Sequence, residues 1–203
     1  MISGCESAAE VFADYGAGIL GEAFSGTNDV TIAKCVSSGS VYGNVVGGIV
    51  SYFSGGMATL DRCTFDGGLT AECMVGGIIQ YCGVKDGDRV IVRDCTVRGG
   101  LNIPVSGETD GSGGLVGVMN KEAVFEGKNK VACYMRYYDD ATMIGGAVGC
   151  SKFNRDQTKL MLGDHVEVAD EIFTTEVLGE TISNTSHDRK IGRYCGEPWI
   201  NEL

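Results

Sequence analysis

The sequence is poor in proline and histidine, and each shortage excludes a class of structure or chemistry. Proline and histidine each occur only 2 times in 203 residues. So little proline excludes a disordered, proline-rich linker. His165 and His187 are too few and too far apart for a histidine metal centre or a Ser-His-Asp triad. We therefore predict no metal site, no cofactor and no catalytic residue.

Positive charge and long apolar segments are also scarce. The chain has 16 Lys and Arg against 27 Asp and Glu, which gives a formal charge of -11. An acidic surface repels phosphate, so we expect no nucleic-acid partner. No stretch approaches the roughly 20 apolar residues of a membrane-spanning helix, so we expect no membrane insertion.

Cysteine is abundant, but no two cysteines have the C-x-x-C spacing of a metal site. The count of nine is odd, which argues against a complete set of disulfides. We expect mostly free, buried thiols that fill the core. A few disulfides could form if the compartment is oxidising. The nine are Cys5, Cys35, Cys63, Cys73, Cys82, Cys95, Cys133, Cys150 and Cys195.

Glycine, at 32 residues, is the abundant residue, and much of it belongs to a repeat. A first pattern has an apolar residue, two small residues, two mostly apolar residues and a small one. It occurs six times, at 16–21, 46–51, 75–80, 112–117, 144–149 and, in degenerate form, 191–196. Recurrence along the whole chain predicts one repeat domain.

A second pattern alternates with the first and has a large apolar residue, two polar or small residues, and a cysteine or its replacement. It occurs at 2–5, 32–35, 60–63 and 92–95, and more weakly at 125–128 and 162–165. Ile2 and Ile32 are 30 residues apart, as are Gly18 and Gly48. Later periods are longer, which indicates loops inserted at one corner of a coil. Because the chain starts inside a repeat, we expect a fragment of a longer protein.

The repeats favour strands over helices, because short β-branched segments such as Val90-Ile91-Val92 lie between glycines. Leu60 and Cys63 are three residues apart, so they cannot both face inward along one straight strand. The chain must turn at Asp61-Arg62, and each repeat then supplies about three short strands.

The sequence therefore predicts an all-β fold, a right-handed parallel β-helix (β-solenoid) of about six coils. Residues 1–166 form the repeats, and residues 167–203 form a last degenerate coil and a C-terminal cap of the same domain. Handedness follows only from the general preference of parallel crossovers and from the resemblance described below.

Stacking of coils places like residues over like. We expect one buried ladder of aliphatic and aromatic residues and a second ladder of cysteines, in which Lys128 and His165 replace cysteine in the later coils. The first ladder is Ile32, Leu60, Val92, Phe125 and Leu162, and the second is Cys5, Cys35, Cys63 and Cys95.

The unit formed by 46–51, 55–56 and 60–69 resembles the GLUG-motif repeats of bacterial cell-surface proteins, and Gly113-Gly114-Leu115-Val116-Gly117 matches that motif best. The resemblance implies a β-helix in a secreted or wall-attached, adhesin-like protein, and hence an extracellular or cell-surface location. It implies no catalytic residue, because the motif is structural.

The densest aromatic patch lies between two repeats. Tyr134, Tyr137 and Tyr138, together with Arg136, are the candidate ligand-binding residues, because exposed aromatics on an inserted loop grip sugar rings or a partner protein. The competing interpretation, which we favour, is local packing beneath a corner loop.

A second candidate is a row of acids at one corner. Asp61, Asp94 and Asp164 could stack there beside Arg62 and Arg93, as carboxylates cluster in polysaccharide-cleaving β-helix enzymes. The favoured interpretation is a solvated corner of alternating charge, because the positions drift by one residue between repeats.

These observations predict a non-enzymatic module of a bacterial surface or secreted protein, with an adhesion, ligand-binding or stalk role. Its partner would be a host or bacterial surface glycan or protein. The alternative is a polysaccharide-active β-helix enzyme, either a lyase or a glycoside hydrolase. A spacer without a ligand is a third interpretation.

Overall fold

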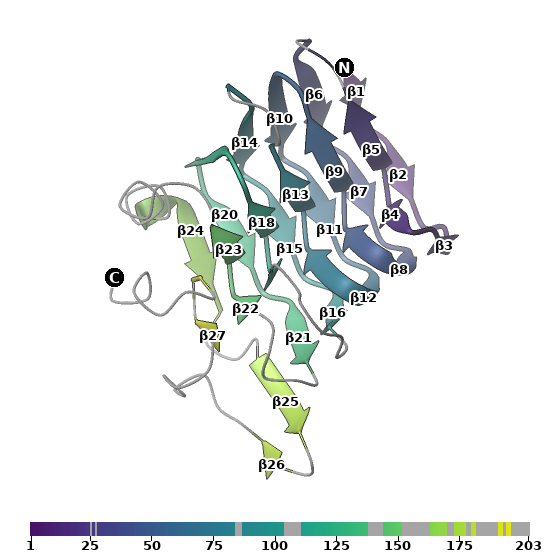
Figure 1. The fold of residues 1–203 in the computed structure, drawn as a ribbon, viewed down its shortest axis with the longest axis vertical. Coiled ribbons are helices and arrows are strands. Elements are labelled where there is room, and N and C mark those ends of the chain that lie inside the picture. Colours follow the sequence, from purple (N-terminus) through teal and green to yellow (C-terminus); the bar gives the residue numbers. More distant parts are fainter. Residues whose placement is uncertain are drawn as a thin grey trace.

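A computed structural model shows an all-β protein in which parallel sheets stack as a β-solenoid (Figure 1). The structure describes residues 1–24, 26, 28–83, 87–103, 111–137, 144–151, 163–169, 173–177, 180–181, 191–192 and 194–195. No α-helix occurs in these ranges, and a single 3-10 turn spans Gly163–His165. The predicted fold class is confirmed.

Four parallel sheets make up the solenoid, and we name them A to D in the order in which a coil passes through them. Sheet A contains β1 (Ile2–Ser3), β6 (Val30–Ala33), β10 (Met57–Asp61), β14 (Arg89–Arg93) and β19 (Glu122–Glu126). Sheet B contains β2 (Glu6–Ser7), β7 (Val36–Ser37), β11 (Thr64–Phe65), β15 (Thr96–Val97), β20 (Asn129–Val131) and β24 (Val166–Val168). Sheet D contains β5 (Leu20–Phe24), β9 (Val50–Ser54), β13 (Ile79–Cys82), β18 (Val116–Met119) and β23 (Val148–Ser151).

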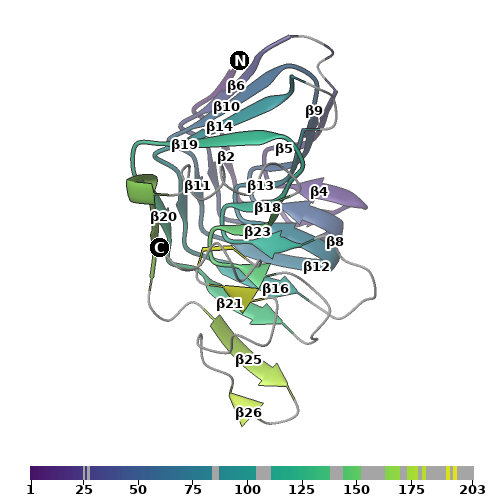
Figure 2. The same ribbon diagram turned by 60° about the vertical axis from the view of Figure 1, so that its left-hand side comes forward.

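Sheet C is the largest and is bent, so that most coils cross it in two segments. Its strands are β3 (Val11–Phe12), β4 (Tyr15–Ala17), β8 (Ser40–Gly47), β12 (Gly68–Gly76), β16 (Gly100–Ile103), β17 (Ser112–Gly113), β21 (Tyr134–Tyr137), β22 (Ile144–Gly145), β25 (Phe173–Val177), β26 (Glu180–Thr181) and β27 (Ile191–Gly192). A coil thus has four sides rather than the predicted three, as Figure 2 shows. The sequence motifs mark only two of its corners.

The coil count was overestimated. Sheets A and D have five strands each, so about four full turns lead from the first coil to the fifth, whereas we predicted about six coils. The last copies of the motifs contribute little to the described stack. Leu162 lies outside the described residues. The described part of the final glycine motif supplies β27, a bridge from Cys195 to Val148, and the Tyr194 carbonyl oxygen, which accepts the Ala147 and Val148 amides.

The ladder of large apolar residues forms as predicted from Ile32 to Phe125, and its last predicted member, Leu162, lies outside the described residues. Parallel pairing joins Ile2 to Ile32, Ile32 to Leu60, Leu60 to Val92 and Val92 to Phe125. From Ile32 onward these side chains are at most 2% exposed. Each rung therefore extends one continuous core, which is the main source of stability in a solenoid.

The predicted turn between the two ladders is a left-handed residue at the junction of sheets A and B. Lys34, Arg62 and Asp94 have φ angles of 54°, 53° and 51°, and Gly4 and Gly127 occupy the same corner with φ of 65°. A left-handed residue reverses the inward and outward alternation of a strand, so Leu60 and Cys63 both face the core.

The cysteine ladder is correct for three rungs, but the residues that continue it were misassigned. Cys35, Cys63 and Cys95 are fully buried, whereas Cys5 is exposed. Pairing of β15 with β20 shows that Asn129, not Lys128, follows Cys95, and Val166, not His165, comes next. The cause is one extra residue after Gly127, which leaves Lys128 and His165 exposed outside the corner.

The double glycine of the first pattern forms the corner between sheets C and D. A Cβ on Gly48 would lie 2.0 Å from the carbonyl oxygen of Gly77 and 2.5 Å from the ring of Phe65. Phe65 belongs to sheet B, so its side chain crosses the interior to reach this corner. Only glycine leaves room for that side chain and for the next coil.

The strands beyond residue 166 extend the sheets already described. β24 pairs in parallel with β20, and β25 pairs in parallel with β21. β26 then pairs antiparallel with β25, away from the main stack in Figure 1. Whether residues 167–203 act as a cap, and the hand of the coil, remain predictions.

Candidate functional site

The outer face of sheet C carries a row of side chains that cross the coils at one register position. Inward residues alternate with outward ones along each strand. The inward row, Val41, Leu69, Leu101 and Met135, is fully buried. The outward row is Phe12, Tyr42, Thr70, Asn102 and Arg136, none of which is buried.

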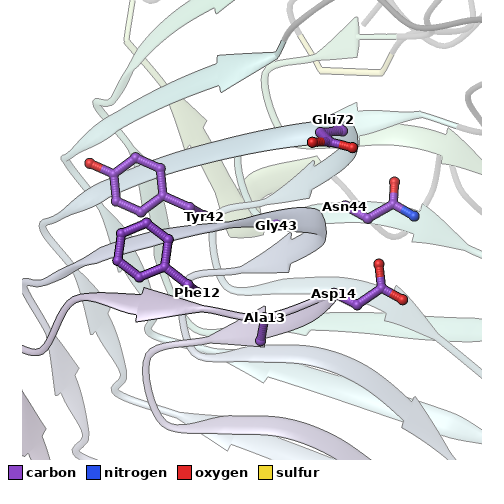
Figure 3. A pocket seen from close by; sticks show the side chains of 7 residues that line it. All are labelled: Phe12, Ala13, Asp14, Tyr42, Gly43, Asn44 and Glu72. Carbon is purple, nitrogen blue, oxygen red and sulfur yellow. The ribbon is translucent and has the colours of Figure 1, made fainter.

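An aromatic platform begins this row. The rings of Phe12 and Tyr42 stack with their centroids 4.9 Å apart and their planes 9° from parallel, as Figure 3 shows. Phe12 is 72% exposed, so a large part of its ring is open to solvent. Both residues follow a buried valine, Val11 being partly and Val41 fully buried, which orients the rings outward.

A polar row lies beside the platform, where sheet C bends. Asp14, Asn44 and Glu72 come from three successive coils, and with Phe12 and Tyr42 they line an open groove of about 420 Å³ (Figure 3). The backbone fixes this bend, because the amides of residue 44 and of the following valine donate to the Asp14 carbonyl oxygen at 3.2 and 2.9 Å.

Gly43 allows the coils to approach at this groove. A Cβ at that position would lie 1.9 Å from the carbonyl oxygen of Ala13. The chain therefore combines a flat aromatic surface, two carboxylates and an amide in one hollow. The aromatic rings can stack on a ligand ring, the carboxylates can accept hydrogen bonds, and the amide can donate two hydrogens and accept as well.

The predicted binding residues lie at the far end of the same face, but on a strand and not on an inserted loop. Tyr134 and Arg136 are both on β21, and the guanidinium of Arg136 lies 5.9 Å from the centre of the Tyr134 ring. Tyr134 is 44% exposed. For Tyr137 the structure describes only the backbone, which pairs with Ile103, and Tyr138 is outside the described residues.

The Thr70 and Asn102 side chains connect the two ends of the row. The Asn102 amide nitrogen donates to the Thr70 hydroxyl at 3.2 Å. Both side chains are partly exposed and keep further hydrogen-bonding capacity. The face thus presents aromatic, neutral polar and cationic groups in order along the solenoid axis.

A second aromatic cluster lies on sheet D and is part of the packing of the solenoid. Tyr52 and Tyr81 stack with centroids 5.1 Å apart, and Phe24 and Tyr15 pack against Tyr52. Burial, together with the neighbouring Tyr81, raises the pKa of Tyr52. Tyr52 and Tyr81 occupy one register position on successive coils.

The acidic corner considered for catalysis is an alternating ion-pair ladder. In register, Asp61 faces Arg93 and Arg93 faces Glu126. The Arg93 Nε donates to Glu126 at 2.8 Å, and Arg62 pairs with Asp61 at 2.6 Å. These hydrogen bonds raise the pKa of both guanidiniums.

The three acids considered as a catalytic row, Asp61, Asp94 and Asp164, do not form one. Asp94 occupies the left-handed corner beside this ladder, and its carboxylate accepts the Lys128 amide at 2.8 Å. Asp164 lies in the 3-10 turn and is exposed. The interpretation as a corner of alternating charge agrees with this geometry.

Metal ligands do not gather in the described part of the chain, where no group of three or more His, Cys, Asp or Glu side chains could hold an ion. The Asp88 carboxylate instead accepts the backbone amides of Gly55 and Gly56, both at 3.1 Å. The His165 Nδ1 lies 3.0 Å from the Gly127 carbonyl oxygen, to which it can donate a hydrogen bond. His187 is outside the described residues.

All nine cysteines lie in the described residues, and none of them is part of a disulfide. Burial raises the pKa of the Cys82 and Cys133 thiols to about 12, so both are protonated and unreactive at neutral pH. Most of these thiols therefore act as core residues, as predicted.

Comparison with known proteins adds no relative. No family model matches the chain, and no curated protein and no solved structure is significantly similar to it. Within the described residues, no helix has the length and hydrophobicity needed to span a membrane.

The sequence pointed to the Tyr134 and Arg136 end of the outer face of sheet C, but not to the Phe12 and Tyr42 end. Phe12 and Asp14 lie in the first coil, between the recurring motifs. The 30-residue period that relates Ile2 to Ile32 also relates Phe12 to Tyr42 and comes from the sequence alone. Applied to every residue of the first coil, that period would have identified the platform.

Proposed function

We propose that this chain is a non-enzymatic β-solenoid module that binds an extended glycan along the outer face of sheet C, in an adhesive role on a bacterial surface or secreted protein. The observation that carries the proposal is the groove in which exposed Phe12 stacks on Tyr42 beside Asp14, Asn44 and Glu72.

The chemistry of this groove suits a sugar ring. The C–H groups of a pyranose carry a small positive charge and pack on the negative face of an aromatic ring. Sugar hydroxyls donate to carboxylates such as Asp14 and Glu72, and they accept from amides such as Asn44. An apolar small molecule would remove water from these polar groups and offer no hydrogen bond in return, which favours a hydroxylated ligand.

The shape of the face suits a chain of sugars. Neighbouring coils are about 4.8 Å apart, so the row from Phe12 to Arg136, four spacings long, extends over roughly 19 Å. Several linked sugars could contact it at once. The resemblance to GLUG-motif repeats supports an extracellular setting for such a ligand.

Replacement of Tyr42 by alanine is expected to weaken glycan binding about tenfold, because it removes half of the platform and leaves Phe12 unsupported. Ligands would first be found on a panel of immobilised neutral and acidic oligosaccharides, and affinities then measured by calorimetry. Tyr52→Ala is the matched control, since it breaks a similar stack on sheet D. Equal losses in the two variants would contradict the proposal, as would binding that Tyr42→Ala leaves unchanged.

A polysaccharide hydrolase is the second candidate, and one feature of the groove favours it. Asp14 and Glu72 are two coils apart, or about 9.5 Å, near the separation of the two carboxyl groups in inverting glycosidases. A general acid is normally kept protonated by an apolar pocket, however, whereas both of these side chains are exposed.

We therefore expect no release of reducing ends from any oligosaccharide that binds. The measurement is a reducing-sugar assay on wild type, Asp14→Asn and Glu72→Gln over a long incubation. Product formation by wild type that either variant abolishes would reassign the groove as an active site.

A further inference from the structure

We propose that Cys5 and Cys35 are an oxidation site, and that under oxidising conditions they form a disulfide that ties the first coil of the solenoid to the second. The inference concerns the end of the cysteine ladder and does not rest on the glycan-binding role.

The two cysteines are direct neighbours in the stack. Ser3 pairs with Ala33 before them, and Glu6 pairs with Val36 after them. The Val36 amide also donates to the carbonyl oxygen of Cys5 at 2.8 Å. In-register parallel residues lie about 4.8 Å apart, within the range of roughly 4.4 to 6.8 Å that a disulfide requires between Cα atoms.

The two thiols occupy equivalent positions in their coils and differ in access. The Cys35 Sγ donates to the Ala33 carbonyl oxygen at 3.4 Å, and the Cys5 Sγ lies 3.9 Å from the equivalent carbonyl oxygen of Ser3. Cys5 is exposed, so an oxidant can reach it, whereas Cys35 is fully buried behind it. The arrangement is therefore an accessible thiol backed by a second thiol that can resolve a mixed disulfide.

The first coil can make the adjustment that a disulfide needs, and the inner coils cannot. Parallel side chains point the same way, and bridged Cβ atoms must approach to about 3.5 to 4.5 Å, less than the spacing of the coils. In the described structure β2 pairs only with β7, so it can tilt toward that strand. Cys63, by contrast, precedes β11, which is held between β7 and β15.

The reaction balances with a disulfide such as oxidised glutathione as the oxidant. The Cys5 thiolate attacks one sulfur of glutathione disulfide, that S–S bond breaks, and one glutathione thiolate leaves. Cys35 loses its proton to the departing thiolate and attacks the Cys5 sulfur, which releases the second glutathione. Two protein thiols are oxidised and one glutathione disulfide is reduced. Burial raises the pKa of Cys35, which assigns the first attack to Cys5.

The test is incubation of the whole chain with glutathione disulfide, followed by intact mass measurement and peptide mapping after alkylation of the remaining thiols. We expect the protein to lose two hydrogens and to yield one cross-linked peptide that joins Cys5 to Cys35. Amide hydrogen exchange in 2–24 should slow about 100-fold, because the link restricts separation of the first coil from the second.

Three variants make the outcome decisive. Cys35→Ser should stop at one bound glutathione on Cys5, Cys5→Ser should lose no hydrogens, and Cys63→Ser should cross-link like wild type. The exposed position of Cys5 leaves the fold of Cys5→Ser intact. A glutathione adduct that persists on wild-type Cys5, or a cross-link between other cysteines, would overturn the proposal.

Discussion

Replacement of Gly77 by alanine is expected to lower the free energy of unfolding by at least about 3 kcal/mol. The new Cβ would lie 1.9 Å from the carbonyl oxygen of Gly114 and 2.8 Å from a methyl group of Val97. The first contact is with the backbone of the next coil, so no change of rotamer relieves it. The coils would have to separate, and the hydrogen bond from the Gly77 amide to Gly113 would lengthen.

The matched control is Gly100→Ala. Gly100 lies on the outer face of sheet C, and a Cβ there would meet nothing within 4 Å. Its replacement should change stability by less than about 0.5 kcal/mol. Urea unfolding of both variants measures the difference, with equal slopes confirming a common unfolded state. If Gly77→Ala were as stable as Gly100→Ala, the role assigned to the double glycine would be wrong.

The ladders could be predicted because they repeat with a fixed chemistry. Ile32, Leu60 and Val92 recur three residues before a cysteine, and that spacing requires a turn between them. The left-handed Lys34, Arg62 and Asp94 are that turn. The left-handed conformation could not be predicted from the identities of these residues, because lysine and arginine rarely adopt a positive φ. In the weaker copy at 125–128 the same corner holds Gly127, a residue that adopts a positive φ readily.

The number of sides and coils could not be predicted in the same way. The strands of sheet B are only two or three residues long, and sheet C bends without a recurring residue at the bend. Such short segments carry no periodicity of their own. The later coils also lose the cysteine, so a single added residue after Gly127 moved the predicted ladder to Lys128.

The arrangement of side chains on the outer face of sheet C was only partly predictable, for a physical reason. A sequence shows aromatic density, which marked Tyr134 and its neighbours, but it does not show which residues of separate coils stand side by side. Phe12 and Tyr42 are one rung apart in space and a full period apart in the chain. Their contact depends on register, which pairing between coils sets.

Asn129 occupies the cysteine position in the fifth coil. Replacement of Asn129 is expected to be the most damaging polar substitution in the core. Its Oδ1 accepts the Cys95 amide at 2.9 Å. Its Nδ2 faces three carbonyl oxygens, those of Val92 and Glu126 at 3.1 Å and that of His165 at 3.2 Å. In the coils before it, the Cys95 and Cys63 thiols make the equivalent contact, to Leu60 and Ile32 respectively.

Asn129→Ala should cost about 4 kcal/mol, because it leaves the buried Cys95 amide without its acceptor and removes the side-chain hydrogen bonds to three carbonyl oxygens. Asn120→Ala is the control, since its side chain makes one described hydrogen bond, to the Gly83 carbonyl at 2.8 Å, and is partly exposed. That control should lose about 1 kcal/mol in the same urea titration. Equal losses would mean that the Asn129 contacts add nothing to ordinary packing.

Asn129→Asp keeps the shape and tests the charge. A carboxylate there would face carbonyl oxygens, so the folded state should raise the pKa of the new acid above its usual value near 4. A raised folded-state pKa means that the stability of the variant is highest below about pH 4 and falls as the pH rises through the folded-state value. We expect the deficit relative to wild type to be larger at pH 7 than at pH 4, reaching about 3 to 5 kcal/mol. A deficit that does not change between these two pH values would show that water reaches the site and that the Asn129 amide is not the donor on which this corner depends.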